Sequence, residues 1–232
     1  MLWQRCQQGE AYIYRPSYGR IAKLLSSVAA SGAFVPRILS QSDVADFRER
    51  LCEVATDIYI EKGLEGLNMR ELAARLGISA MTPYRYFKDK DEILAAIRSR
   101  AFNRFADRLE ETMAGPAAAA EKNEAVAKAY IRFALEQSCC YRLMFDLSCP
   151  HMEPADELRA AEHRARAVLT GHARNMVQQG FFHGDPELIG PVLWSALHGA
   201  AALYLSGGLA EGEFDATRNE LMRIFTGAYR TV

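Results

Sequence analysis

Apolar residues recur at intervals of three and four along most of the chain, and this spacing limits the possible folds more than any other feature. In the first such run the apolar positions are Phe47, Leu51, Val54, Ala55 and Ile58. On a helix these positions share one face, whereas a half-buried strand would alternate apolar and polar residues. Because no alternation is sustained for more than a few positions, the sequence predicts an all-α fold.

The composition is that of an ordinary globular protein and excludes a chain that is disordered throughout. The 232 residues are 50% hydrophobic and 25% charged, with a formal net charge of -1. A chain of this length buries a sufficient core without disulfides or a structural metal. The five cysteines form no Cys-X-X-Cys pair and no secretory signal is evident, so we expect a reducing, cytoplasmic location.

Residues 188–210 contain no Asp, Glu, Lys or Arg, a length sufficient to cross a membrane. Pro191, His198, the alanine-rich composition and the lack of flanking basic clusters favour a soluble protein instead. A helix that is apolar all round is otherwise a buried one. We therefore expect no membrane span, and we expect this segment to be covered on every side.

Residues 46–92 have the pattern of consecutive short helices. The first is predicted to end near Gly63. Asn68 is a typical N-cap for the second, Glu71 is placed to return a hydrogen bond to that cap, and Gly77 ends the helix where a left-handed residue is usual. Two short helices joined by such a turn form a helix-turn-helix.

A third helix is predicted at roughly residues 80–87, with Ser79 as its N-cap and Pro83 within its first turn. Acidic residues at its end favour the start of a fourth, long helix, which Gly115 and the following proline stop. The helices after the third are expected at residues 93–114, 122–138, 139–147, 156–179, 185–206 and 215–230.

The segment from Leu72 to Leu94 contains a small residue at position 73, the turn glycine, the quartet Tyr-Arg-Tyr-Phe and the run Lys-Asp-Lys. This segment resembles the DNA-binding domain of the TetR/AcrR family of bacterial transcriptional regulators. Farther along, Tyr141–Phe145 and Trp194–Gly199 resemble the subgroup whose C-terminal domain is named for a Trp-His-Gly motif. The resemblance implies a ligand-responsive repressor that binds a palindromic operator as a homodimer and is released by a small-molecule effector.

We therefore expect a helix-turn-helix domain at residues 46–92 and a helical effector-binding and dimerisation domain at residues 93–232, connected through a helix at residues 93–114. Residues 1–45, basic and aromatic, have no counterpart in the family. They either dock on a stripe of carboxylates or reach along DNA as an arm. The stripe comprises Glu49, Glu53, Asp57 and Glu61 and is directed away from DNA. The alternative interpretation is that it is simply a solvated helix face.

A two-turn helix fits the major groove of DNA, where its first turn faces base edges and its flanking hydroxyl and cationic groups reach phosphates. The first turn here has no bidentate guanine reader, so DNA shape or Arg85 is expected to supply part of the specificity. Phe87 is assigned to the core. The candidate residues for contacts with double-stranded operator DNA are Asn68, Arg70, Ser79, Ala80, Met81, Thr82, Tyr84, Arg85, Tyr86, Lys88 and Lys90.

The resemblance also implies a pocket for a small apolar effector in the C-terminal domain. Aromatic residues and methionines supply such pockets but also supply ordinary cores, so both interpretations stay open for each residue. His198 is either a satisfied buried histidine or a ligand contact. The candidate effector residues are Tyr130, Phe133, Met144, Phe145, Met176, Trp194 and His198.

Small residues spaced by three and four in the uncharged helix leave a smooth stripe that another helix can approach closely. Together with the last helix, this stripe is expected to form half of a two-fold four-helix interface between two copies of the chain. The candidate interface residues are Ser195, Gly199, Ala202, Ser206, Leu221, Ile224, Phe225 and Ala228.

No catalytic motif is present, so an enzyme is not expected, and neither is a cofactor. The histidines show no i,i+4 pair, which argues against a metal site. Cys139 and Cys140 are interpreted as buried small hydrophobes, with oxidant sensing as the alternative. The alternative function for the whole chain is a helical ligand-binding or enzyme-like protein that has lost specific DNA binding, and a salt titration against upstream DNA would distinguish the two.

Overall fold

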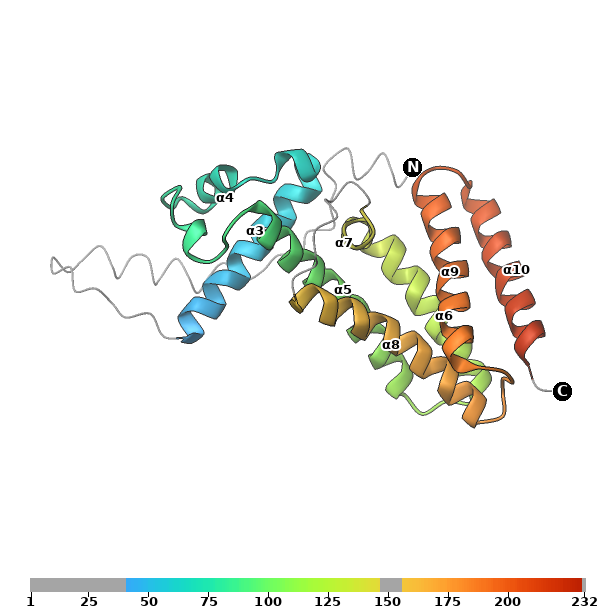
Figure 1. Ribbon diagram of the computed structural model, residues 1–232. Coiled ribbons are helices and arrows are strands. Elements are labelled where there is room, and N and C mark those ends of the chain that lie inside the picture. The colour runs from blue at the N-terminus through green and yellow to red at the C-terminus, as the bar shows by residue number, and fades with distance from the viewer. Residues whose placement is uncertain (1–40, 147–155, 231–232) are drawn as a thin grey trace. The chain divides into compact units, whose positions relative to one another are not determined.

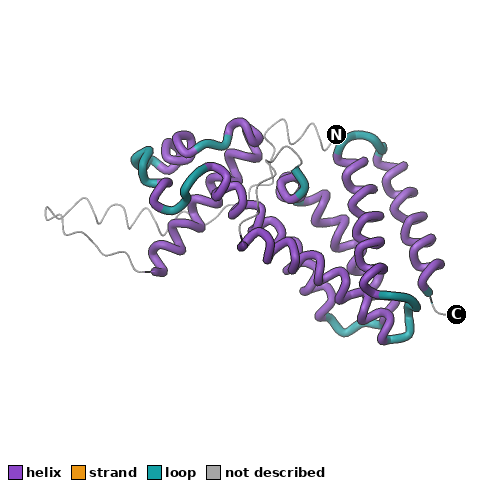
Figure 2. Tube along the Cα trace, in the orientation of Figure 1, coloured by secondary structure: helices purple, strands orange, loops and turns teal. Residues whose placement is uncertain are grey.

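The computed structural model describes residues 41–146 and 156–230 (Figure 1). These residues are helical, and the β pairing among them is one isolated bridge between Phe182 and Arg230, so the all-α class is confirmed (Figure 2). The chain divides into two compact units, residues 1–51 and 52–232. The helices are α3 (Gln41–Gly66), α4 (Met69–Leu76), the 3-10 helix η2 (Pro83–Arg85), α5 (Lys90–Ala114), α6 (Ala119–Glu136), α7 (Ser138–Met144), α8 (Asp156–Gln178), α9 (Pro186–Leu205) and α10 (Glu211–Tyr229).

Helices α6 to α10 begin and end within four residues of the predicted positions. The long helix α5 begins at Lys90, because the side chain of Asp89 caps it by accepting a hydrogen bond from the Glu92 amide at 2.9 Å. Helix α3 begins earlier than predicted, at Gln41, and is kinked at Gly63, where the backbone φ is 67°. Most of the predicted extension, residues 1–40, lies outside the described residues.

Both ends of α4 are held as the sequence predicted. The Glu71 amide donates to Asn68 Oδ1 at 2.9 Å, and Gly77 adopts a left-handed φ of 63° while its amide reaches the carbonyls of the last turn. The expected return bond from the Glu71 side chain to the cap is replaced, because that carboxylate binds Lys62 and Arg75 instead. Local capping therefore sets the length of α4, and tertiary ion pairs use the carboxylate.

The predicted third helix at residues 80–87 is wrong in extent: the structure has only the 3-10 turn Pro83–Arg85. Pro83 has no N–H to continue an α-helical pattern from Ser79, whose carbonyl is taken by the Thr82 amide at 2.8 Å. The Phe87 amide then reaches the Pro83 carbonyl at 3.0 Å, which directs the Phe87 side chain into the core, where 1% of it is exposed. Ser79 accordingly lies in a turn and does not cap an α-helix.

Helix α5 packs against α6, α7 and α8. The buried ring of Phe105 on α5 makes edge-to-face contacts with Tyr130 and Phe133 on α6, with centroids 5.2 and 5.3 Å apart. Helices α8 and α9 approach so closely that a Cβ added at Gly190 would lie 2.8 Å from Thr170 Cα. Interior space in this domain is therefore filled by rings, and one glycine permits the α8–α9 contact.

Helix α9 is long and apolar enough to span a membrane, but only 33% of its most apolar window is buried in the chain. The described helices of this chain therefore cover α9 only in part, and the expectation that it is covered on every side stays a prediction. Leu188, Val192 and Leu203 are all largely exposed. Helix α10 packs against α9 and covers part of its surface, and the remaining apolar face is left open.

Candidate nucleic-acid interface

The turn between α4 and η2 presents an apolar, solvent-facing surface. Met81 has 69% and Tyr84 48% of its surface exposed, and Ala80 is exposed beside them. The Met81 amide lies 3.4 Å from Ser79 Oγ, a local side-chain contact that stabilises the turn. Exposed large side chains next to buried Pro83 and Phe87 cannot serve the core, so this surface is available for a partner.

Three cations flank this surface without a carboxylate partner among the described residues. They are Arg70 in the first turn of α4, Arg85 in η2 and Lys88 after it, all exposed. Lys90 differs, because its ammonium donates to the carbonyl of Leu64 at 2.6 Å and so holds the end of α3. A contact of Lys90 with DNA would therefore compete with its hydrogen bond to Leu64. The other three cations form no ion pair in the described part of the chain.

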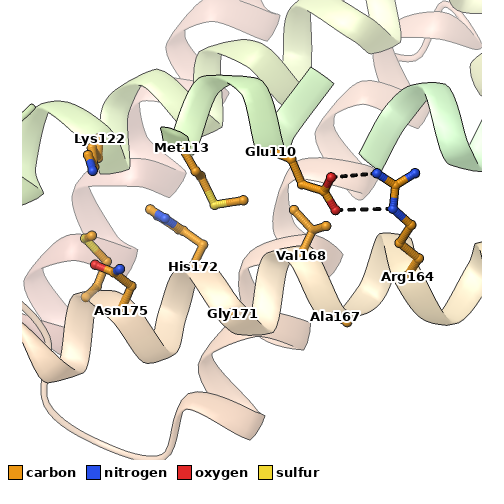
Figure 3. A pocket seen from close by; sticks show the side chains of 10 residues that line it. Glu110, Met113, Lys122, Arg164, Ala167, Val168, Gly171, His172 and Asn175 are labelled. Atoms are coloured by element: carbon orange, nitrogen blue, oxygen red, sulfur yellow. Dashed lines mark hydrogen bonds and ion pairs between the residues drawn. The ribbon is translucent and has the colours of Figure 1, made fainter. Parts of the chain in front are cut away.

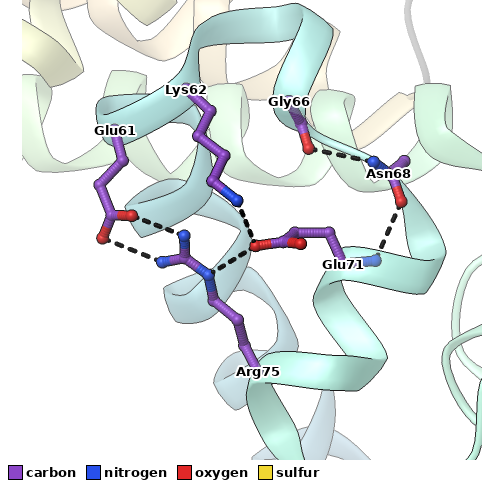
Figure 4. A network of polar contacts seen from close by, with 6 residues as sticks. All are labelled: Glu61, Lys62, Gly66, Asn68, Glu71 and Arg75. Atoms are coloured by element: carbon purple, nitrogen blue, oxygen red, sulfur yellow. Dashed lines mark hydrogen bonds and ion pairs between the residues drawn. The ribbon is translucent and has the colours of Figure 1, made fainter.

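An ion-pair network attaches α4 to the last turns of α3 (Figure 4). Arg75 forms a bidentate pair with Glu61 at 2.9 and 2.5 Å, and its Nε lies 3.1 Å from the Glu71 carboxylate. Lys62 Nζ donates to the same carboxylate at 2.7 Å. These hydrogen bonds, from Lys62 first and then Arg75, lower the pKa of Glu71. The network fixes the angle between the two helices and withdraws two cations from any phosphate.

Glu61 belongs to the predicted carboxylate stripe and faces α4, so the stripe is not simply a solvated surface. Its hydrogen bonds to Arg75 lower the pKa of Glu61 and keep it charged. This end of the stripe is therefore directed at the helix-turn-helix. The proposed docking of residues 1–45 on the stripe concerns a segment that lies, up to residue 40, outside the described residues.

The candidate effector residues form one aromatic cluster. Tyr141 on α7 hydrogen-bonds both Tyr130, with the two hydroxyls 2.8 Å apart, and His198 Nδ1 at 2.7 Å. The Phe145 ring lies 4.3 Å from that of His198 and 6.2 Å from that of Trp194. Burial lowers the pKa of His198, so its ring is neutral at pH 7. The Tyr141 hydroxyl satisfies Nδ1 of half-buried His198, and both interpretations of this residue stay open.

Four of the seven candidate effector residues have buried side chains. Tyr130, Phe133, Met144 and Met176 are each at most 2% exposed. Of the seven predicted effector residues only Met176 lines the cavity of about 380 Å³ found between α5, α6 and α8 (Figure 3). The residues chosen from the sequence are mainly apolar, and apolar side chains pack closely against one another in a protein interior.

The candidate interface stripe lies mainly at the surface. Ser195, Ser206 and Ala228 are exposed, Ile224 is 54% exposed, and Gly199, Ala202 and Leu221 are partly exposed. Phe225 is the exception, because its ring lies 5.6 Å from that of Phe182 and is 5% exposed. Phe225 therefore belongs to the chain's own core, and its assignment to an interface between copies is wrong.

Two contacts that the sequence did not indicate connect α7 to earlier helices. Tyr59 of α3 donates to Asp146 at 2.7 Å, and Arg98 of α5 donates to the Met144 carbonyl at 3.1 Å. Both partners lie next to Phe145, which contacts the ring of His198. Residues 144–146 thus contact α3 and α5 as well as α9. Sequence separations of 46 and 87 residues leave no local signal for such contacts.

Metal and thiol chemistry receive little support from the described residues. No group of three or more His, Cys, Asp or Glu side chains is arranged to hold a metal ion in the part of the chain that the structure describes. Cys139 and Cys140 are partly buried, and neither forms a disulfide in the described part of the chain. Burial raises the pKa of the Cys140 thiol, which keeps it protonated and slow to react.

Two protein-family models match the chain. "Bacterial regulatory proteins, tetR family" matches residues 51–97, and "Tetracyclin repressor-like, C-terminal domain" matches residues 124–226. Among curated proteins, an HTH-type transcriptional regulator of Staphylococcus aureus (strain bovine RF122 / ET3-1) is 35% identical over 65 residues, which are 28% of this chain and 35% of that protein. The chain thus spans about a third of the length of the curated relatives it matches.

Solved structures resemble the chain over a greater length. A protein of unknown function from Rhodococcus sp. RHA1 has a TM-score of 0.70 and 25% identity over 79% of this chain and 95% of that one. A transcriptional regulator of the TetR/AcrR family from Thermobifida fusca has a TM-score of 0.59 and 25% identity over 80% of this chain and 100% of that one. The likeness to these two structures therefore extends over 79% and 80% of the chain.

Proposed function

Because the chain belongs to the tetR family of bacterial regulatory proteins, we propose that it is a DNA-binding transcriptional regulator and not an enzyme. It binds a palindromic operator as a homodimer, represses transcription, and is released by a small-molecule effector. It acts in the cytoplasm and is not inserted in a membrane. The helix-turn-helix domain spans residues 46–92, and the effector-binding and dimerisation domain spans residues 93–232.

The exposed surface around the turn is the observation that carries DNA binding. Exposed Met81 and Ala80 offer methyl groups to thymine, and Tyr84 offers a hydroxyl to a phosphate. Arg70 and Arg85 are exposed without a carboxylate partner among the described residues. A phosphate is the natural partner for such a planar cation. The other proposed DNA contacts are Asn68, Ser79, Thr82, Tyr86, Lys88 and Lys90.

Dimerisation is supported by the open apolar face of α9, which would be costly to leave in water. Val192, Ser195, Gly199 and Leu203 follow one another at spacings of three and four on that helix, and exposed Ile224 lies on the adjacent α10. A second copy related by a two-fold axis offers the same stripe in return. The proposed interface comprises the predicted residues other than Phe225.

Coupling of effector to DNA is supported by the contacts of residues 144–146 described above. A ligand that changes the packing around Phe145 would alter the Tyr59–Asp146 hydrogen bond, which reaches α3. We further propose membership of the Trp-His-Gly subgroup. Its support is that Trp194 and His198, one turn apart on α9, both contact the Phe145 ring.

The first prediction concerns Arg85. Replacing it with Ala removes one phosphate contact per protomer, so affinity for a duplex of the chain's own upstream DNA falls at every sequence tested. The slope of log affinity against log salt becomes shallower by about one per protomer. Fluorescence anisotropy at several salt concentrations measures both quantities. Arg132→Ala, an exposed cation on α6, is the matched control and leaves both unchanged.

Wild-type binding that disappears at the salt concentration that removes competitor DNA would contradict specific recognition altogether. It would favour the second class of protein, a helical ligand-binding chain without an operator. Unchanged binding by Arg85→Ala would instead leave DNA recognition intact and remove Arg85 from the interface.

A further inference from the structure

The cavity between α5, α6 and α8 is elongated and has a different chemical character along its length (Figure 3). Five α8 residues that line it, Arg164, Val168, Gly171, His172 and Asn175, are spaced by four, three, one and three positions. At 1.5 Å per residue this row extends for about 16 Å along the helix. The opposite wall carries Met113 of α5 and Lys122 of α6. The cavity therefore suits an extended molecule lying along α8.

At one end of the cavity, carboxylates surround the guanidinium of Arg164. Arg164 donates to Glu110 at 3.2 and 2.6 Å and to Asp107 at 2.7 Å, so two carboxylates surround one guanidinium. These bonds, to Glu110 first and then Asp107, raise the pKa of Arg164. The local excess is one negative charge, which would repel an anionic group placed there.

The other end carries the uncompensated positive charge. Lys122 lines the cavity, and its ammonium has no carboxylate partner in the described part of the chain. Beside it, buried His172 places Nε2 3.3 Å from Asn123 Oδ1, an arrangement in which a neutral ring donates its proton to the amide oxygen. Figure 3 shows Lys122 and Asn175 at the end away from the Glu110–Arg164 pair. An anion at this end would therefore meet one free ammonium.

The middle of the cavity is apolar. Met113, Ala167 and Val168 line it, and Gly171 adds no side chain. An added Cβ at Gly171 would meet no atom within 4 Å, so the space above it is open. A volume of about 380 Å³ holds about a dozen non-hydrogen atoms if each occupies as much as a water molecule, roughly 30 Å³.

We propose that this cavity binds a small amphipathic carboxylate of about a dozen non-hydrogen atoms, with its carboxylate on Lys122 and its apolar body along Met113 and Val168. Its role as the effector rests on the proposed regulatory function; its binding to the free protein does not. The residues that line the cavity share only Met176 with the seven candidate effector residues predicted from the sequence. The proposed site is therefore distinct from the aromatic cluster around Phe145.

The binding test uses isothermal titration calorimetry with decanoate and 2-naphthoate as probes of this class. Wild-type protein is expected to bind one molecule of probe per protomer. Lys122→Met weakens binding of each carboxylate by about tenfold or more, while 1-decanol, which lacks the charge, binds both proteins alike. Lys128→Met is the matched control on the same helix, exposed and paired with Glu124, and it leaves carboxylate binding unchanged.

A second variant blocks the cavity without depending on charge. Gly171→Leu places a side chain in the open space, and because leucine is a better helix former than glycine the fold is retained. It is expected to abolish binding of decanoate and 1-decanol together. Failure of both carboxylates to bind the wild type, or equal binding by Lys122→Met, would overturn the proposal, as would tighter binding of decylammonium than of decanoate.

The effector role is tested separately by anisotropy with bound upstream DNA. Decanoate is expected to release wild-type protein from DNA, and to release neither Lys122→Met nor Gly171→Leu at the same concentration. Carboxylate binding without release would overturn the effector role and leave the binding site standing. Absence of specific DNA binding before any ligand is added would contradict the proposed regulatory function instead, so the two failures are distinguishable.

Discussion

Among single residues, His172 shows how the fold changes the chemistry of a side chain. It is 2% exposed on α8, and its described polar neighbour is Asn123, also buried. Burial first, and then the positive charge of Lys122, lower the pKa of His172 to about 4. The ring is therefore neutral throughout the physiological range and contributes a hydrogen bond, not a charge, to the wall of the cavity.

This shift predicts a pH-dependent stability. Because the folded-state pKa of His172 lies below the unfolded value of about 6.5, the unfolded chain binds more protons between these two values. The contribution of His172 to the free energy of unfolding is fully present above pH 6.5. It decreases by up to about 3 kcal/mol as the pH falls toward 4. Urea unfolding of wild type and His172→Gln at several pH values measures the difference in slope.

The substitution His172→Gln is expected to remove that part of the pH dependence. His163→Gln, an exposed histidine on the same helix, is the matched control and keeps the wild-type slope. If the unfolding free energies of wild type and His172→Gln changed with pH in parallel, protonation of the buried ring would not lower the stability of the folded protein, which would contradict the prediction.

At the level of elements, the contact between α8 and α9 depends on the absence of a side chain. A Cβ added at Gly190 would approach Thr170 at its Cα, Oγ1 and backbone nitrogen within 2.8 to 3.0 Å. The obstacle is mainly backbone, which cannot rotate away as a flexible side chain would. The helix–helix distance is therefore set at this crossing.

Gly190→Ala is accordingly expected to destabilise the protein by about 1–3 kcal/mol, as an overpacked core does, although alanine is the better helix former. Gly212→Ala on α10, where an added Cβ meets no atom within 4 Å, is the control and leaves stability unchanged or slightly raised. Both are measured by urea unfolding. Equal stability of Gly190→Ala and wild type would mean that the two helices separate without loss.

For the whole molecule, the open face of α9 and α10 predicts the oligomeric state. Leu203→Asp combined with Ile224→Asp places charges in the proposed interface at residues 52% and 54% exposed, so each chain should still fold. The expected result is a dimer for wild type and a monomer for the double variant, by analytical ultracentrifugation at micromolar concentration. Met81→Asp, with 69% exposure in the helix-turn-helix, remains a dimer as the control. A monomeric wild type would contradict the proposed interface.

Local sequence was enough for features whose partners are a few residues apart. Asn68 and Gly77 were predicted as caps because the groups they satisfy lie within one helical turn. The all-α class and most helix bounds followed from apolar spacing, since that spacing is a property of the helix itself. The third helix was predicted incorrectly because the turn at Ser79 competes for the carbonyl that an α-helix would use.

Tertiary structure decided what each helix face meets. Spacing along one helix identifies a face but not its neighbour, so the sequence could not assign Phe225 to the core, Lys90 to the Leu64 carbonyl or Arg75 to Glu61. For the same reason it selected the aromatic residues that fill the interior, and missed a cavity whose wall combines α5, α6 and α8. The sequence by itself determined the helices and the family of the chain; their packing alone decided where space and unpaired charge remain, because both depend on residues distant in the chain.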